Sequence, residues 1–180
     1  LSYEEVQTTA YIRDALVQAG IRILPYSLET GLVAEITGAK PGACIALRAD
    51  IDALPVAEES GVPYASAYAG KMHACGHDFH TAVLLEAARR LYARRDTLAG
   101  TVRLIFQPGE ESSSGALKIL ATPALDGVQA VFALHAWPFF PAGTVAVRPG
   151  AASASVDRFE ITVTGKGTHA AAPQAGSDPI

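Results

Sequence analysis

The chain is poor in cysteine, in clustered positive charge and in long hydrophobic runs, and each shortage excludes a class of protein. Its two cysteines, Cys44 and Cys75, cannot build the disulfide framework that holds small secreted domains together. The net charge of -4, with no basic run or stripe, argues against nucleic acid as a partner. No apolar stretch approaches the roughly 20 residues of a membrane span, so we expect no membrane partner either.

What is present is the composition of an ordinary globular protein. Of 180 residues, 49% are hydrophobic and 18% are charged, which is enough for a sizeable core. We expect a cytoplasmic protein, although the sequence begins at LSYEEVQ without an initiator Met and a targeting segment could precede it. Because the sequence also ends just after a new element begins, we expect a fragment of a longer protein.

Hydrophobic periodicity predicts strands that alternate with helices. Helices are expected over residues 6–19, 77–95 and 115–121. Strands are expected over residues 21–24, 31–37, 44–49, 101–106, 129–135 and 143–148. Ser2-Tyr3-Glu4-Glu5 fits a capping box ahead of the first helix. The Gly- and Pro-containing turn at 38–42 suggests that the second and third strands form a hairpin.

The alternation indicates an α/β layered fold with a largely buried sheet. The residue pattern of the sequence changes near residue 155. There the small-residue segment GAASAS (150–155) is followed by an alternating strand pattern over 157–165. We therefore expect one domain over 1–155 and the beginning of a second over 156–180.

Three of the predicted strands run directly into acidic or imidazole side chains. The strand at 44–49 is followed by Asp50, the strand at 101–106 by Glu110 and Glu111, and the apolar run AVFAL by His135. In open α/β sheets, ligands bind beyond the carboxyl ends of the strands. The sequence therefore predicts a functional site at that edge of the sheet.

The segment KMHACGHDFHTA (71–82) concentrates metal-ligand side chains ahead of the second predicted helix. Cys75 and His77 are separated only by Gly76, which frees the backbone so that both side chains can face one point. Thiolate and imidazole together suit zinc and its transition-metal neighbours, and His80 could orient a ligating imidazole through a hydrogen bond. The alternatives are a buried structural thiol and solvated histidines.

The adjacent carboxylates Glu110 and Glu111 allow a division of labour. One can bind a metal ion while its neighbour faces the attacking water as general base. The alternative is a pair of carboxylates favoured by the dipole of a helix N-terminus. Together with Cys75, His77 and His135, the pair gives enough ligand-type groups for two metal ions.

Five segments of the chain carry a resemblance to a known family. They are RADIDALPV (48–56), MHACGHDFHTA (72–82), IFQPGEE (105–111), ALHAWP (133–138) and DRFEITVTGKGTHAAAP (157–173). In this order they resemble the motifs of the metallopeptidase and amidohydrolase family of aminoacylases, which includes hippurate hydrolases, auxin-conjugate hydrolases and some carboxypeptidases. The resemblance implies a zinc-peptidase-like α/β domain, a mixed sheet with helices on both faces, and the start of an inserted α+β lid domain through which the protein forms a homodimer.

The resemblance also implies roles for individual residues. The expected ligands of two divalent metal ions, with Zn, Mn, Co and Ni not distinguishable, are Cys75, His77, Glu111 and His135. Glu110 would be the general base, and Asp52 would support the loop that carries the metal ligands. His169, which the sequence alone allows to be an exposed loop histidine, would bind the substrate or the oxyanion from the lid domain.

The implied activity is hydrolysis of the amide bond of an N-acyl amino acid, or a related small conjugate, by metal-activated water. Two alternatives stay open at this point. One is a catalytically inactive homologue that only binds metal or dimerises. The other is a hydrolase that uses the Cys75 thiol as its nucleophile.

Overall fold

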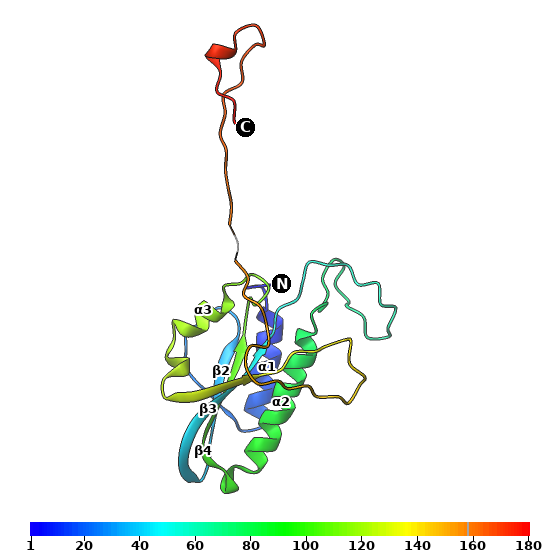
Figure 1. Ribbon diagram of the computed structural model, residues 1–180. Coiled ribbons are helices and arrows are strands. Elements are labelled where there is room, and N and C mark those ends of the chain that lie inside the picture. Colours follow the sequence, from blue (N-terminus) through cyan, green and yellow to red (C-terminus); the bar gives the residue numbers. More distant parts are fainter. Residues whose placement is uncertain (158) are drawn as a thin grey trace. The chain divides into compact units, whose positions relative to one another are not determined.

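The computed structural model describes residues 1–157 and 159–180, which fall into two compact units, Leu1–Phe139 and Phe140–Ile180 (Figure 1). The first unit holds the whole sheet and the three α-helices. Among the described residues, no helix combines the length and the hydrophobicity that crossing a membrane requires.

The first unit is built on a mixed five-stranded sheet, as expected. Its strands are β1 (Arg22–Ile23), β2 (Leu32–Thr37), β3 (Lys40–Asp50), β4 (Ala99–Gln107) and β5 (Val128–Ala133). They lie in the order β1-β2-β4-β3-β5. β3 runs parallel to both β4 and β5, whereas β2 runs antiparallel to β4 and to β1.

The hairpin expected from residues 31–49 is wrong, because β4 lies between β2 and β3. Leu104 of β4 is paired with Ala34 on one side and with Leu47 on the other. The turn instead crosses the start of β4, where a Cβ atom on Gly38 would lie 2.5 Å from the Leu98 carbonyl oxygen. The glycine in this turn therefore permits a close approach of two backbone segments. It does not mark a hairpin between the strands on either side of it.

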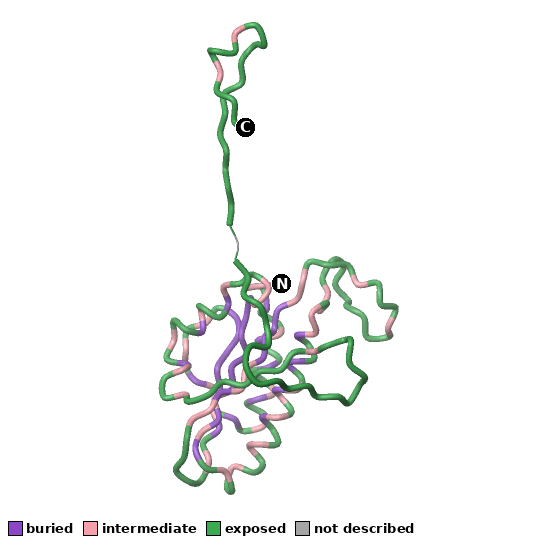
Figure 2. Tube along the Cα trace, in the orientation of Figure 1, coloured by how far each residue is buried: buried purple, intermediate pink, exposed green. Residues whose placement is uncertain are grey.

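Helices cover both faces of this sheet. On one face, α1 (Val6–Gln18) and α2 (His77–Ala93) bury an apolar stripe against the strands. On the other face, the short α3 (Gly115–Leu120) packs Ile119 against a smaller cluster that includes Val33. Figure 2 shows the buried residues concentrated in the strands between these layers.

The capping box expected at Ser2-Tyr3-Glu4-Glu5 is also wrong. α1 begins at Val6, its N-cap residue is Glu5, and no side-chain hydrogen bond caps the helix. The Ser2 hydroxyl donates instead to Asp52 Oδ2 at 2.7 Å. The Ser2 side chain, which the capping-box pattern assigned to the end of α1, thus makes a tertiary contact with a distant segment instead.

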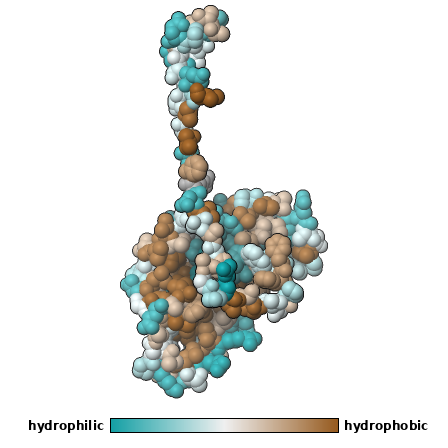
Figure 3. Space-filling model, in the orientation of Figure 1, coloured by the Kyte–Doolittle hydropathy of each residue, from teal (hydrophilic) through white to brown (hydrophobic). Residues whose placement is uncertain are grey.

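The second unit is largely extended and exposed, and Figure 3 shows hydrophobic residues along it that face solvent. The strand expected over 143–148 is wrong: Val145 and Val147 are 87% and 94% exposed and no described residue pairs with the segment. A strand requires a neighbour for its backbone groups. The strand expected over 157–165 includes residue 158, outside the described residues, and residues 159–165 form no strand.

Candidate metal centre

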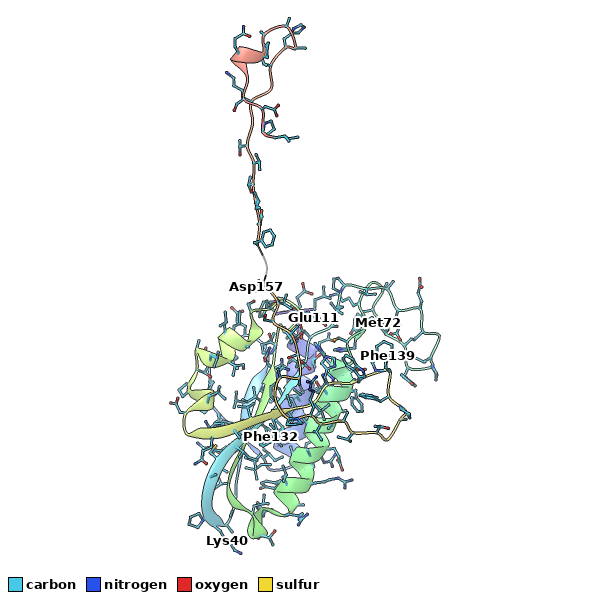
Figure 4. All side chains as sticks on the ribbon, viewed as in Figure 1. Lys40, Met72, Glu111, Phe132, Phe139 and Asp157 are labelled. Atoms are coloured by element: carbon cyan, nitrogen blue, oxygen red, sulfur yellow. The ribbon has the colours of Figure 1, made fainter. Side chains whose placement is uncertain are left out.

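The carboxyl ends of the three parallel strands meet at one edge of the sheet. β3 ends at Asp50, β4 leads through Pro108 and Gly109 into the two glutamates, and β5 leads to His135. In Figure 4, Glu111 lies at the opposite end of the sheet from Lys40, the first residue of β3. The topology thus brings together the polar side chains that follow these strands.

The start of α2 adds Cys75 and His77 to this edge. Gly76 between them has φ +79°, a left-handed conformation that disfavours other residues, and it is the N-cap of α2. A Cβ atom at this position would approach the Cβ of Ala136 to 3.0 Å. The glycine therefore serves both the turn of the chain and its close packing against the segment that follows β5.

Three groups of metal-ligand atoms share His77, with the atoms of each group within 4.8 Å of one another. They are Cys75–His77–His135, His77–Glu110–Glu111 and Asp50–His77–His80. In the first, the Cys75 Sγ lies 3.4 Å from His135 Nε2. In the second, His77 Nε2 lies 3.8 Å from a Glu111 oxygen.

In the third group, Asp50 and His80 are already joined by a hydrogen bond. His80 Nε2 accepts the Ala136 N–H at 2.7 Å, so the proton on Nδ1 is donated to Asp50 Oδ1 at 2.6 Å. Arg48 donates to the other oxygen of Asp50 at 2.8 Å. Although burial acts in the opposite direction, the His80 hydrogen bond and the Arg48 charge lower the pKa of Asp50. Asp50 and His80 are thus a structural pair beside the other two groups.

Asp52 orients His77 and the loop after β4. Its Oδ1 atom accepts a hydrogen bond from His77 Nδ1 at 3.1 Å, and its Oδ2 atom accepts the Glu111 N–H at 3.0 Å. Although burial opposes the shift, the His77 and Ser2 hydrogen bonds lower the pKa of Asp52. With Nδ1–H donated to this ionised carboxylate, the Nε2 lone pair of His77 is left for a ligand.

The unpartnered atoms at the site fit a divalent cation. His77 Nε2 and Glu111 Oε1 are buried and have no hydrogen-bond partner among the described residues, which is costly unless a ligand fills the gap. Burial and the nearby Glu111 carboxylate raise the pKa of the Cys75 thiol to about 11. A cation would offset both effects, and sulfur, nitrogen and carboxylate oxygen donors suit a transition metal such as zinc.

His135 is aimed by its own backbone neighbour. Its Nδ1–H donates to the Ala136 carbonyl at 2.7 Å, which leaves Nε2 as the ring nitrogen that faces Cys75. His169 lies in the second unit, where it is exposed and its Nδ1 accepts the Ala171 N–H at 3.1 Å. The structure thus places the four proposed ligands, the proposed base and Asp52 close together in the first unit. His169 belongs to the second unit, which is described separately.

Sequence reasoning did not find several residues that hold the site. Asp50 was expected at this edge, but its partner Arg48 was not, although a buried carboxylate at the end of an apolar strand must find a partner. Ser2 and Glu5 carried none, because their partners Asp52 and Gly109 are 50 and 104 residues away in the chain.

The chain is similar to known proteins over its whole length. The sequence profile of peptidase family M20/M25/M40 matches residues 46–179. An N-acetyl-L-cysteine deacetylase of Bacillus subtilis is 53% identical over 180 residues, which are 100% of this chain and 43% of that protein. The thermostable carboxypeptidase 2 of Saccharolobus solfataricus is 44% identical over 183 residues, or 100% of this chain and 47% of that protein.

Among solved structures, the crystal structure of a dinuclear metal-binding M20 peptidase from Bacillus subtilis superposes with a TM-score of 0.81 at 51% identity. The match covers 82% of this chain and 42% of that one. The chain therefore spans less than half the length of these relatives.

Proposed function

This chain belongs to peptidase family M20/M25/M40, and from that premise we propose that the whole protein is a metal-dependent amidohydrolase. Its proposed reaction is hydrolysis of the amide bond of N-acyl amino acids or related small conjugates. The observation that carries the proposal is the buried cluster in which His77 Nε2 and Glu111 Oε1 lie 3.8 Å apart, neither with a hydrogen-bond partner among the described residues. The similarity to a deacetylase and a carboxypeptidase supports the same bond type.

The proposed ligands of two divalent metal ions are Cys75, His77, Glu111 and His135. Two overlapping groups of ligand atoms support a pair of ions, as does the similarity to a dinuclear metal-binding peptidase. When bound, such ions polarise the scissile carbonyl and make water acidic enough to serve as a nucleophile at neutral pH.

Glu110 is the proposed general base. Its carboxylate belongs to the same group of atoms as His77 and Glu111, and it makes no hydrogen bond among the described residues. It is therefore available to take a proton from the attacking water and to return that proton to the leaving amine. His169 is proposed to stabilise the oxyanion from the lid domain.

A thiol hydrolase is the second candidate, because the Cys75 Sγ lies 3.4 Å from His135 Nε2. Nucleophilic thiols, however, have a lowered pKa, which electropositive surroundings produce. Burial and the Glu111 carboxylate raise the pKa of Cys75 to about 11 instead. The electrostatics therefore favour Cys75 as a metal ligand over Cys75 as a nucleophile.

The proposed assembly follows from the resemblance of residues 157–173 to the lid segment of aminoacylases. We propose that 1–155 belongs to the catalytic domain and that 156–180 begins a lid domain through which a cytoplasmic homodimer forms. Phe159, Ile161 and Val163 are all more than 60% exposed here, which supports a role in packing against a further layer.

Replacing the proposed base gives the direct test. In the full-length protein, Glu110→Ala should keep the wild-type metal content and lose turnover by about 100-fold to 10,000-fold, the range for removal of a general base. Turnover would be measured on N-acetyl, N-benzoyl and indoleacetyl amino acids, with exposed Glu86→Ala as the control.

Two results would count against this reading. Wild-type kcat in Glu110→Ala would remove Glu110 from the mechanism. A wild-type protein that binds metal but hydrolyses none of these conjugates would favour the inactive metal-binding homologue.

A further inference from the structure

Glu5 is a buried carboxylate that the proposed chemistry does not use. It is 4% exposed, and it forms no ion pair within the part of the chain that the structure describes. A buried carboxylate is costly unless hydrogen bonds replace its hydration. Its position therefore requires an explanation.

Both oxygens of Glu5 hold other segments of the chain. Oε1 accepts the Gly109 N–H at 2.9 Å, and Oε2 accepts the Thr30 hydroxyl at 2.7 Å. Glu5 also occupies the N-cap position of α1, where its side chain makes no capping hydrogen bond but the helix dipole favours its negative charge. Because Gly109 immediately precedes Glu110, this carboxylate ties α1 to the loop that carries the proposed base.

Tyr3 holds the same loop from a second direction. Its hydroxyl oxygen accepts a hydrogen bond from Ser112 at 3.0 Å and also contacts Ser114. Its ring packs against Gly109 so closely that a Cβ atom there would lie 2.5 Å away. Tyr3 itself has φ 65°, an unfavourable conformation for a residue with a side chain, so the surrounding contacts must maintain it.

Two carboxylates from outside the loop hold backbone N–H groups on either side of Glu110. The Gly109 N–H is held by Glu5, whereas the Glu111 N–H is held by Asp52 at 3.0 Å. Glu110 lies between them. Loss of Glu5 would remove the hold on the backbone directly before Glu110, while Asp52 still held Glu111 at the metal site.

We propose that Glu5 is a positioning residue that fixes the loop at Gly109 and so aims Glu110 at its substrate. This inference rests on the proposed function. Loss of Glu5 should therefore lower turnover without changing metal binding. A misplacement of about 1 Å can cost about 100-fold in rate.

The test compares three variants of the full-length protein loaded with Mn²⁺ or Zn²⁺. Glu5→Met keeps the volume and removes the acceptor, so kcat should fall by about tenfold to 100-fold with KM and metal content unchanged. Glu5→Gln should recover most of the loss, because its amide oxygen can accept from Gly109 while its NH₂ donates to Thr30. Glu4→Met is the matched control, since Glu4 is exposed and pairs with exposed Lys71.

The outcomes separate this inference from the function on which it rests. If the wild type is active and Glu5→Met retains its kcat, or if Glu5→Gln is as impaired as Glu5→Met, the positioning role is overturned. If the metal-loaded wild type is itself inactive, the proposed function fails, and amide exchange over residues 107–114 decides the role of Glu5. Exchange there should be faster in Glu5→Met than in Glu4→Met, and equal rates would overturn the inference.

A misfolded Glu5→Met variant would not end the test. Thr30→Val is isosteric and removes the hydroxyl that holds Oε2, and Glu5 keeps its carboxylate. Amide exchange over residues 107–114 should again be faster than in the wild type. Unchanged exchange would overturn the positioning role.

Discussion

His80 connects three elements through one imidazole ring. It is 2% exposed on α2, its Nδ1–H is donated to Asp50 at the end of β3, and its Nε2 accepts the Ala136 N–H after β5. His135 precedes Ala136 and is exposed, so this hydrogen bond ties the backbone beside His135 to the buried part of the site. We therefore expect His80 to position His135 without binding metal itself.

Replacement of His80 should weaken metal binding at the group that includes His135. In the full-length protein, His80→Leu should lower metal affinity by about 10-fold to 100-fold, as loss of an outer partner of a ligand commonly does. Competition with a chelating dye would measure this, and the absorption of the Co²⁺-loaded protein would report the altered coordination. Phe79→Leu is the neighbouring control, because Phe79 is 53% exposed. Equal affinities in the two variants would show that His80 does not position His135.

At the scale of elements, the start of α2 depends on a single glycine. Gly76→Ala should destabilise the full-length protein by about 1–2 kcal/mol through its left-handed φ, with an added cost from the 3.0 Å approach to Ala136. It should also weaken metal binding, because Cys75 and His77 flank the glycine. Gly70→Ala is the matched control, with φ +71° and nothing within 4 Å. Urea unfolding and metal titration would measure both effects, and equal losses in the two variants would contradict the packing role.

The elements also show what the sequence can predict. Periodicity identified the helices at 77–95 and 115–121, because each buries a stripe of its own residues. Periodicity and turn signals failed at the expected hairpin of β2 and β3. The strand that lies between them, β4, comes much later in the chain. The sequence pattern failed at the capping box for the same reason: Ser2 bonds to a distant partner that no local pattern reveals.

The same limit applies to the candidate site. Cys75, His77 and Glu111 could be selected from residue type and spacing, because metal chemistry requires those donors. His80 and Asp52 were also expected to support the ligands, but the specific links could not be predicted, since those from Glu5 to Gly109 and from His80 to Ala136 span 104 and 56 residues. Such hydrogen bonds follow from the folded topology and leave no periodic signal in the chain.

At the scale of the whole molecule, the fold concentrates carboxylates around the proposed metal ligands. Glu111, Glu110 and Asp50 all act with burial to raise the pKa of Cys75, and His77 presents an unpartnered nitrogen to the same space. Binding that occurs only in the native state stabilises the protein by mass action. Bound metal should therefore contribute to stability as well as to catalysis.

Removal of metal from the full-length protein tests both contributions together. A chelator should abolish turnover and lower Tm, since a ligand at about 1,000 times its dissociation constant stabilises the native state by about 4 kcal/mol. Added Mn²⁺, Zn²⁺ or Co²⁺ should restore turnover and Tm in the wild type but only Tm in Glu110→Ala, because that variant keeps its ligands. Cys75→Ser should show a smaller rise in Tm at the same metal concentration.

Full turnover in the chelated wild type, lost only on alkylation of Cys75, would instead identify a thiol hydrolase, because a nucleophilic thiol requires no metal ion.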